Sequence, residues 1–419
     1  MNTASLEKTT SLFGVSLTMF LIFTGLSSGQ FHSYLFESRG LQALEIGLIL
    51  MAGQAVGMLS PLFQIAAIRR LHGPRLPLIL MLLGTAAALA LLPRLAGFWP
   101  LFLCFSIFSF CGAAIFPLNA ACTFESMRNH GHGAFFRIRS FGTLGFLAGC
   151  VVSVFFPRLM DLPWLYGGFS ACLVFALATV AWEYRNAPSA AGPSATPGSG
   201  GSTLSGSSSA AAGPAMPSFL AAVKLLAEPR TLRLLVFLGA LNFANTMASG
   251  MQGNYLVDRW HQGQRTISMA WGISTGCEVP LMLLCAAVLR RFGLRYVIGL
   301  GILGTVVKLA GLALAREVWQ YYLALSLHGC FFSGALTGFS VFLDRNYRKE
   351  ERAALQSLAP VFYAAIPASL SGLTSGLVWH AFSLRAVYGL AGGIALATGI
   401  VGWWLLRDSL SVTGKPVRT

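Results

Sequence analysis

Residues 69–89 read RRLHGPRLPLILMLLGTAAAL, a basic turn that leads directly into an apolar run, and residues 290–309 repeat the arrangement as RRFGLRYVIGLGILGTVVKL. The paired arginines lie 221 positions apart and the shared Leu-Gly-Thr triplets 220 positions apart. Similarity at a fixed offset indicates two copies of one structural unit. A chance likeness between two basic loops is the alternative, but the match falls where duplication of a six-helix unit would place it.

The composition is that of a protein embedded in a membrane. Of the 419 residues, 55% are hydrophobic and only 10% are charged, and the mean hydropathy is +0.68. Because a soluble domain carries about 25% charged residues, this chain lacks the polar side chains that a water-facing surface of its size needs. Twelve spans of about 20 residues use more than half of the chain, which leaves no room for a large soluble domain.

Apolar runs long enough to cross a bilayer fall into two sets of six. The sequence predicts spans at 11–36, 43–68, 76–94, 98–124, 137–157 and 162–183, and again at 232–257, 267–289, 295–315, 318–343, 355–379 and 385–406. The segment 186–218 between the sets is uncharged and rich in Gly, Ser, Ala and Pro, as in a flexible tether. We therefore predict an all-α integral membrane fold of twelve transmembrane helices, with pseudo-symmetric halves at 1–185 and 219–419 and a cytoplasmic linker at 186–218.

The net charge of +15 does not indicate a nucleic-acid partner. Cytoplasmic loops of membrane proteins collect lysine and arginine. With the N-terminus inside, the predicted cytoplasmic segments hold twenty of the 29 cationic side chains and the outside segments hold seven. This asymmetry predicts a multi-pass protein of the plasma membrane, the inner membrane in a bacterium, with both termini cytoplasmic. We expect a monomer whose surroundings are the lipid bilayer.

Motifs for covalent chemistry are missing from the sequence. No nucleophile elbow, zinc-protease motif, phosphate-binding loop or paired-cysteine metal motif occurs. The eight cysteines lie singly inside apolar runs, so we interpret them as reduced packing residues. The sequence therefore predicts neither an enzyme nor a protein with a cofactor or metal.

Ionisable side chains inside the predicted spans are the strongest functional signal. A charge in the hydrocarbon layer costs about 2.5 to 3.5 kcal/mol, so each one needs a partner or a watery cavity. The candidates are Arg139, Glu278, Lys308 and His328, with Glu125 at the end of the fourth span as a weaker one. Around a central cavity they would form a network whose protonation depends on what is bound. A set of polar contacts between helices is the alternative.

Neutral polar and aromatic residues of the spans are candidates for contact with a substrate. Their side chains can hydrogen-bond to a polar solute or stack on its ring, although most such residues join one helix to another. The candidates are Tyr34, Asn119, Asn242, Asn245, Gln252, Asn254 and Gln356, together with the aromatic Tyr255, Trp271, Phe332 and Tyr363.

Two six-helix halves, a repeated basic turn and a long central linker resemble the major facilitator superfamily of transporters. Within it, residues 137–146, RIRSFGTLGF, look like the helix-5 signature of the branch that holds lactose permease, the nucleoside/proton symporters and the phenylpropionate permease. This resemblance implies that Arg139, Thr143 and Phe146 contact the ligand.

The second half carries further matches to the same branch. Glu278 aligns with a carboxylate of the nucleoside symporters, and Lys308 aligns with one of their arginines. The remaining matches are Gly253-Asn254 on helix 7, Leu327-His328-Gly329 on helix 10, and Arg352 with Gln356 at the start of helix 11. The resemblance implies the twelve-helix transporter fold over most of residues 10–405.

The sequence also departs from these relatives. The superfamily's turn between helices 2 and 3 reads Gly-x-x-x-Asp-Arg, whereas residues 64–70 here, QIAAIRR, lack the glycine and the aspartate. The acid that the relatives have on helix 10 is replaced by Phe331 or Ser333, and Thr275 takes the place of a helix-8 glutamine. The resemblance therefore supports the scaffold more strongly than it supports a nucleoside as the substrate.

We predict a secondary active transporter that takes up a nucleoside, or a related small polar solute with a ring, by proton-coupled alternating access. Glu278 would carry the proton or respond to it, Lys308 and His328 would tune its protonation, and Arg139 would link the solute to this network. A uniporter, an exchanger, or a symporter of sugars or aromatic acids is the alternative within transport. A transport-inactive membrane sensor is the alternative from another class.

Overall fold

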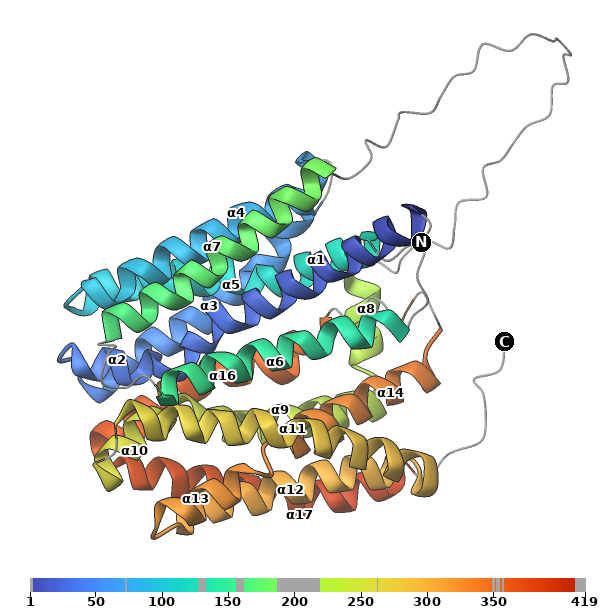
Figure 1. Cartoon of the computed structure of the whole chain (residues 1–419). Coiled ribbons are helices and arrows are strands. Elements are labelled where there is room, and N and C mark those ends of the chain that lie inside the picture. Colours follow the sequence, from blue (N-terminus) through green and yellow to red (C-terminus); the bar gives the residue numbers. More distant parts are fainter. Residues whose placement is uncertain are drawn as a thin grey trace, which may run out of the picture.

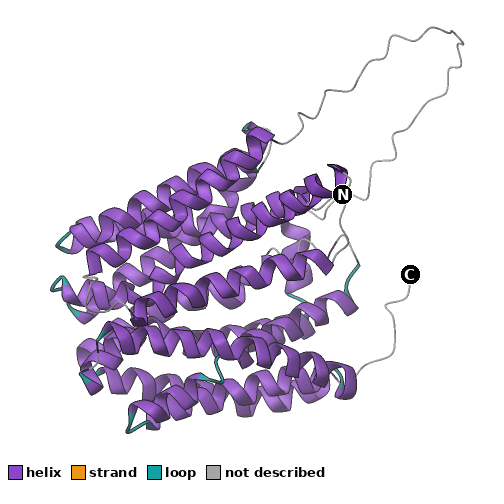
Figure 2. Cartoon of the chain, viewed as in Figure 1, coloured by secondary structure: helices purple, strands orange, loops and turns teal. Residues whose placement is uncertain are grey.

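The computed structural model describes residues 3–71, 74–126, 133–155, 162–186, 219–261, 263–348, 351, 355 and 358–410. Within these ranges every regular element is helical, as Figure 2 shows in purple. The predicted linker from 187 to 218 and the C-terminal residues from 411 onward lie outside the described residues. The domain boundaries at 185 and 219 therefore stay predictions.

The first six spans lie between residues 3 and 186, and the first of them is not a continuous α-helix. It consists of α1 and α2, joined by the 3₁₀ turn η1. The elements are α1 (Thr3–Leu26), η1 (Ser27–Phe31), α2 (His32–Ser38), α3 (Ala43–Arg70), α4 (Arg75–Leu91), η2 (Leu92–Arg94), α5 (Phe98–Ser126), α6 (Gly133–Phe155) and α7 (Leu162–Asn186).

The last six spans contain more interruptions. The seventh is split between α9 and α10, and the tenth and eleventh each include a π-helical segment. The elements are α8 (Phe219–Leu226), α9 (Pro229–Gly250), α10 (Gln252–Trp260), α11 (Gln264–Phe292), α12 (Leu294–Leu314), α13 (Val318–Leu325), η3 (Cys330–Leu336), α14 (Thr337–Asn346), η4 (Val361–Ala365), α16 (Ile366–Ala381) and α17 (Leu384–Leu410).

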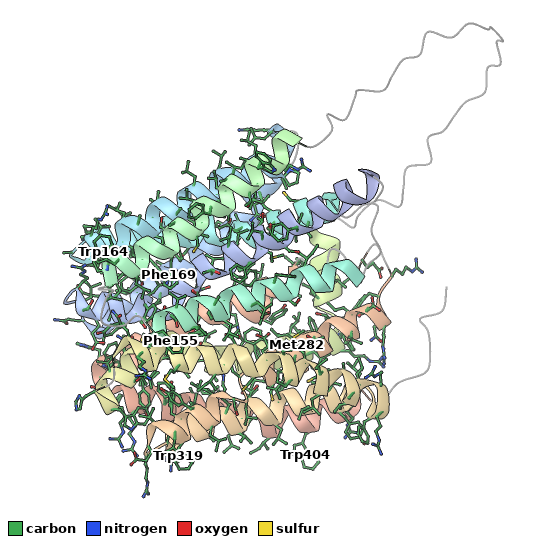
Figure 3. The ribbon with its side chains drawn as sticks, viewed as in Figure 1. Phe155, Trp164, Phe169, Met282, Trp319 and Trp404 are labelled. Carbon is green, nitrogen blue, oxygen red and sulfur yellow. The ribbon has the colours of Figure 1, made fainter. Side chains whose placement is uncertain are left out.

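Length and hydropathy allow eleven of these helical segments to cross a bilayer. The remaining span, α6, has an apolar stretch at Ser140–Phe155. Large apolar side chains cover the outside of the bundle: Phe155, Trp164, Trp319 and Trp404 are each more than 60% exposed (Figure 3). An exposed apolar surface of this kind suits lipid, and the predicted all-α membrane fold is confirmed.

The packing of the first six spans is repeated by the last six. If α1, α3, α4, α5, α6 and α7 are matched with α9, α11, α12, η3, α16 and α17, the most extensively contacting pairs of the first set each have a contacting pair in the second. The matching pairs are α1–α6 with α9–α16, α1–α7 with α9–α17, α3–α5 with α11–η3, α4–α5 with α12–η3, and α4–α7 with α12–α17. The two most extensive contacts between the sets are α3–α16 and α6–α11, and the correspondence maps each of them onto the other. Such an arrangement is expected of parallel repeats related by a two-fold axis along the membrane normal.

The interruptions of the first and seventh spans fall at corresponding positions of this repeat. Residues 27–37 read SSGQFHSYLFE and residues 248–258 read ASGMQGNYLVD, again 221 positions apart. They share Ser-Gly, Tyr-Leu and a final acidic residue. In the first copy the α-helix gives way to η1, and in the second copy α9 ends at Gly250 before α10 begins at Gln252.

The two halves meet most closely at one end of the bundle. We call the end where α1 begins and α17 ends the terminal end, and the opposite end, which carries α2 and α10, the distal end (Figure 1). At the distal end α3 packs directly on α16 through glycines: a Cβ on Gly47 would lie 2.7 Å from the Cα of Gly376 and 2.8 Å from the carbonyl oxygen of Gly372. Toward the terminal end, α1, α4 and α7 splay away from α11 and α12 (Figure 1).

Adding a methyl group at the α3–α16 crossing should destabilise the protein. We expect Gly376→Ala to cost about 1–3 kcal/mol, because backbone atoms on both helices would have to move apart. The check is the midpoint of thermal unfolding in detergent. The matched control is Gly168→Ala on α7, where a Cβ would meet nothing within 4 Å, so helix propensity makes that change neutral or stabilising. Equal midpoints for the two variants would contradict close packing of α3 on α16.

Candidate functional site

A buried lysine lies at the centre of the C-terminal half. Lys308 on α12 is only 2% exposed. Its ammonium group donates a hydrogen bond to Oδ1 of Asn245 on α9, and it lies 3.2 Å from Nδ1 of His328, between α13 and η3. An ammonium group in a low-dielectric interior needs such acceptors, because burial without them costs several kcal/mol. The three residues therefore hold together three of the spans of this half.

The contact with Lys308 determines how His328 carries its proton. When Lys308 is charged, its ammonium group has only donors, so Nδ1 of His328 accepts in this contact. The neutral imidazole then carries its hydrogen on Nε2. The ring is further surrounded by aromatic groups, with its centroid 6.3 Å from that of Trp271 and 5.3 Å from that of Phe332.

Aromatic rings continue from this cluster across the boundary between the halves. Trp271 on α11 lies between His328 and Phe146 on α6, and its ring centroid is 6.2 Å from that of Phe146. The indole nitrogen of Trp271 is buried and has no hydrogen-bond partner among the described residues. A ring system with an unused donor, at the junction of the two halves, suits recognition of a solute that has both a ring and a polar edge.

Glu278 on α11 lies next to the turn that carries His328. A Cβ on Gly329 would lie 2.8 Å from the Cα of Glu278 and 3.3 Å from its Cβ, so α11 carries this half-buried glutamate directly past the His328 turn. Thr275 lies on α11 almost one turn earlier and is also half-buried. The structure thus places the backbone of Glu278 beside the turn that carries His328, and His328 in turn contacts Lys308. A role of these three residues in proton coupling stays a prediction.

The predicted residues of α6 share one side of that helix. Arg139, Thr143 and Phe146 are spaced four and three residues apart, which places them on one helical face. Phe146 marks this face as the one that meets Trp271. Arg139 and Glu125 are described only as helical backbone positions, and Gln356 lies outside the described residues.

Asn119 lies elsewhere, inside the N-terminal half. Its Nδ2 lies 3.2 Å from the sulfur of Met19, and it lines a cavity of about 10 Å³ between α1, α4, α5 and α7. A cavity of that size holds at most one water molecule. Asn119 is therefore separate from the cluster around Lys308.

Asn254 joins the two halves at the distal end. Its Nδ2 donates to the carbonyl oxygen of Ser33 at 3.0 Å and to Oε2 of Glu37 at 2.6 Å, both in the first span. Tyr34 packs beside it, because a Cβ on Gly253 would lie 3.3 Å from the Cβ of Tyr34. Ser33 and Asn254 occupy equivalent positions of the repeat, and equivalent positions touch only near the axis that relates the halves. Two predicted contact residues, Asn254 and Tyr34, thus belong to the closure of the distal end.

An open pocket lies further toward the terminal end of the C-terminal half. It has a volume of about 260 Å³ and is lined by Phe339, Ser340, Leu343, Ala359 and Tyr363. No charged residue is among these five. The rings of Phe339 and Tyr363 meet edge to face with centroids 5.9 Å apart.

The sequence indicated Lys308 and His328 as ionisable residues of the spans, but it did not indicate which neutral residues lie next to them. Asn245 and Trp271 were only members of a long set of polar and aromatic candidates, whereas the structure places them in direct contact with Lys308 and His328. The only signal available from sequence was a polar or amphipathic side chain inside an apolar span, and this signal is shared by many residues that merely join helices.

Comparison with known proteins points to one family and one fold. Residues 12–390 match the model of the family described as "MFS_1 like family". The protein "Sugar efflux transporter A" of Dickeya chrysanthemi is 27% identical over 155 residues, and this alignment covers 37% of the chain and 38% of the relative's length.

Solved structures of transporters share the architecture over nearly the whole chain. A variant of the nucleoside transporter NupG has a TM-score of 0.77 at 16% identity, covering 96% of this chain and 100% of that one. A bacterial homologue of the human lysosomal transporter Spinster, in an inward-facing and unoccupied conformation, has a TM-score of 0.72 at 12% identity, covering 98% and 99%. At these identities the likeness concerns the fold alone, and the predicted major facilitator fold is confirmed.

Removing the acceptor of Lys308 should destabilise the bundle. We expect Asn245→Leu to cost about 1.5–3 kcal/mol, because the ammonium group loses a buried hydrogen bond. Adding Lys308→Met should recover part of that loss, because the charge left without its acceptor is gone. Thermal unfolding of the single and double variants measures both effects. Asn242→Leu, on the same helix but bonded only weakly to the carbonyl of Ala364 at 3.5 Å, is the control, and additive losses would contradict the coupling.

Proposed function

The chain belongs to the MFS_1 like family of membrane transporters, and we propose that it takes up a nucleoside, or a related small polar solute with a ring, by proton-coupled alternating access. The observation that supports this solute class is the run of rings from Phe146 through Trp271 to His328, which crosses the boundary between the halves. A solute bound there touches both halves, so its binding energy depends on how the halves are arranged.

Rocking of the halves about this site opens the ends of the bundle in turn. In the structure the distal end is closed by the hydrogen bond from Asn254 to Glu37, together with the packing of α3 on α16. Opening the distal end breaks that bond and exposes the aromatic run from that side. In the membrane we place the terminal end in the cytoplasm, in agreement with the lysine and arginine distribution, and the protein works as a monomer in the bacterial inner membrane.

Proton coupling is assigned to Glu278 with Lys308 and His328. The carboxylate takes up a proton when the site faces outside and releases it inside, and the buried cation next to His328 makes its protonation depend on the packing around it. Arg139 links the bound solute to this group. Phe331 and Ser333 stand where related transporters have a helix-10 acid, so a uniporter or exchanger is the second candidate for the energetics.

Transport in the opposite direction is a further candidate, supported by a specific observation. The relative from Dickeya chrysanthemi is named as a sugar efflux transporter. Export of a glycoside would use the same aromatic run and the same network, with the proton moving against the solute instead of with it.

Uptake into proteoliposomes tests the proposed function. With an imposed proton gradient, acid outside, we expect accumulation of labelled uridine or methyl β-D-glucoside above the external concentration, and alkalinisation outside when solute is added without a gradient. Glu278→Gln should abolish accumulation yet keep solute exchange, because a neutral amide cannot exchange the proton. Glu317→Gln, at the distal start of α13, is the control. Accumulation by Glu278→Gln would overturn the role of this carboxylate. If the unaltered protein only equilibrates the solute and does not accumulate it, the protein is a uniporter. If preloaded glycoside leaves the vesicles against its gradient, the protein is an exporter.

Breaking the bond across the distal end should favour the state that is open there. Glu37→Ala removes the acceptor of Asn254, and a hydrogen bond to a charged group is worth about 1.5–3 kcal/mol, or about ten- to a hundredfold in the equilibrium between the two states. Glu37→Gln keeps an acceptor oxygen and should shift the equilibrium far less. Spin labels at Ser38 and Arg259, both exposed at the ends of α2 and α10, in a background without the eight native cysteines, report the distance. An unchanged distance distribution in Glu37→Ala would remove this bond from the gate.

A further inference from the structure

We propose that Gln30 and Gln252, at the two repeat-related helix interruptions, form a hydrogen-bond-donating subsite for a neutral, hydroxyl-bearing solute, next to the indole N–H of Trp271. The inference rests on the proposed function and goes beyond it by assigning a new contact residue, Gln30, and a charge class for the solute. The residues are carried by η1, α10 and α11, which come from both halves of the protein.

Both glutamines are buried with an unused donor group. Gln30 and Gln252 are each 3% exposed, and the Nε2 atom of each has no hydrogen-bond partner among the described residues. The same holds for the indole nitrogen of Trp271. A buried N–H group without a hydrogen-bond acceptor lowers the stability of the folded protein. Native proteins keep such a group where a ligand or an ordered water molecule accepts the hydrogen bond.

A chain of close contacts places these donors in one region. Oε1 of Gln30 accepts from the thiol of Cys150 at 3.7 Å. Cys150 in turn faces α11, because a Cβ on Gly272 would lie 3.6 Å from the Cβ of Cys150. Gly272 directly follows Trp271, and Cys150 lies one helical turn beyond Phe146 on α6. Gln30 is thus adjacent to the aromatic run of the candidate site.

The second glutamine lies on the neighbouring segment of the other half. A Cβ on Gly253 would lie 3.6 Å from the backbone oxygen of Gln30, so Gln252 and Gln30 lie on segments that touch. These segments are the two copies of the repeat, and Ser33 and Asn254 a few residues further on lie in contact across the axis. The subsite is therefore on the axis, at the distal side of the aromatic run.

The chemistry of this region selects a neutral solute. Gln30, Gln252 and Trp271 offer N–H donors without a formal charge. Two charged groups described nearby are already hydrogen-bonded within the protein: Lys308 to Asn245 and His328, and Glu37 to Asn254. Neutral donors match hydroxyl, carbonyl and ring oxygens, as on a nucleoside or glycoside, whereas an anion would call for a free cation.

The interruption of the helices explains why side chains here can serve a ligand. At η1 and at Met251 the chain leaves the regular α-helix, which turns neighbouring side chains away from the positions they would have on a continuous helix. Paired interruptions at equivalent positions of two repeats mark the binding region in many transporter folds. The glutamines lie within one residue of these interruptions or inside them.

Leucine substitutions separate a ligand contact from a structural role. Gln30→Leu and Gln252→Leu keep most of the side-chain volume and remove an unpaired buried amide, so we expect unfolding midpoints without solute to stay the same or rise. Affinity for uridine, measured by calorimetry on the purified full chain, should fall about three- to tenfold in each. Gln64→Leu is the matched control: that buried glutamine already donates to Ser60 at 3.3 Å, so its loss should lower the midpoint and leave affinity unchanged.

Deoxy solutes identify the atoms that meet the glutamines. With the unaltered protein, 2′-deoxyuridine or 3′-deoxyuridine should bind more weakly than uridine, and for at least one of them the difference should disappear in Gln30→Leu or Gln252→Leu. If both leucine variants keep the uridine affinity of the unaltered protein, the subsite is wrong but the proposed function stands. The same conclusion follows if affinity falls only in parallel with a lower unfolding midpoint. Binding of benzoate with no binding of uridine or methyl β-D-glucoside by the unaltered protein overturns both the neutral subsite and the proposed solute class.

Discussion

The rule that every backbone polar group in the hydrocarbon layer must be hydrogen-bonded within the protein governs this structure. It forces the spans into helices and allows departures from the α-helix only where protein covers them. The 3₁₀ turn η1 illustrates this, because four of its five residues are buried and it contacts α6 and α7 on one side and α10 and α11 on the other. The break after α9 centres on Met251, which is fully buried. The irregular backbone at η1 and at Met251 thus lies on the axis between the halves, where we also propose the solute site.

A second constraint, the cost of charge in a low-dielectric interior, shapes the C-terminal half. Lys308 is held by Asn245 and His328, and these contacts tie α9, α12 and the α13–η3 junction into one unit. The π-helical segment η3 starts two residues after His328, and π-helical segments are found frequently at functional sites. Helix α11 carries Glu278 past this unit, at its close approach to Gly329 beside His328. Stability and proposed coupling therefore depend on the same few contacts.

The repeat accounts for the common architecture of the two halves, and the residues that differ between its two copies make the halves chemically different. Ser33 and Asn254 are equivalent, yet only Asn254 supplies a side-chain amide, and it bonds both to its counterpart's carbonyl oxygen and to Glu37. Glu37 is half-buried in this contact, whereas its counterpart Asp258 is exposed. Gln30 corresponds to Met251, and Gln252 corresponds to Phe31, so each repeat contributes one glutamine at a different position. In the proposed subsite, a duplicated unit would thus offer different groups to the two sides of an asymmetric solute.

The sequence by itself determined the membrane location, the helical class, the number of spans and the two-fold repeat, because hydropathy and a fixed offset are local properties of the chain. It also made Glu278, Lys308 and His328 candidates, since ionisable residues are conspicuous inside apolar runs. Only the tertiary structure decided which neutral residues join them: Asn245 and Trp271 lie in the cluster, Asn119 lies apart, and Asn254 bonds across the distal end. Helix periodicity gives the face on which a side chain lies but not the helix it will meet. That partner is set by the packing of spans distant in sequence, so contacts such as Asn254 with Glu37 become visible only in three dimensions.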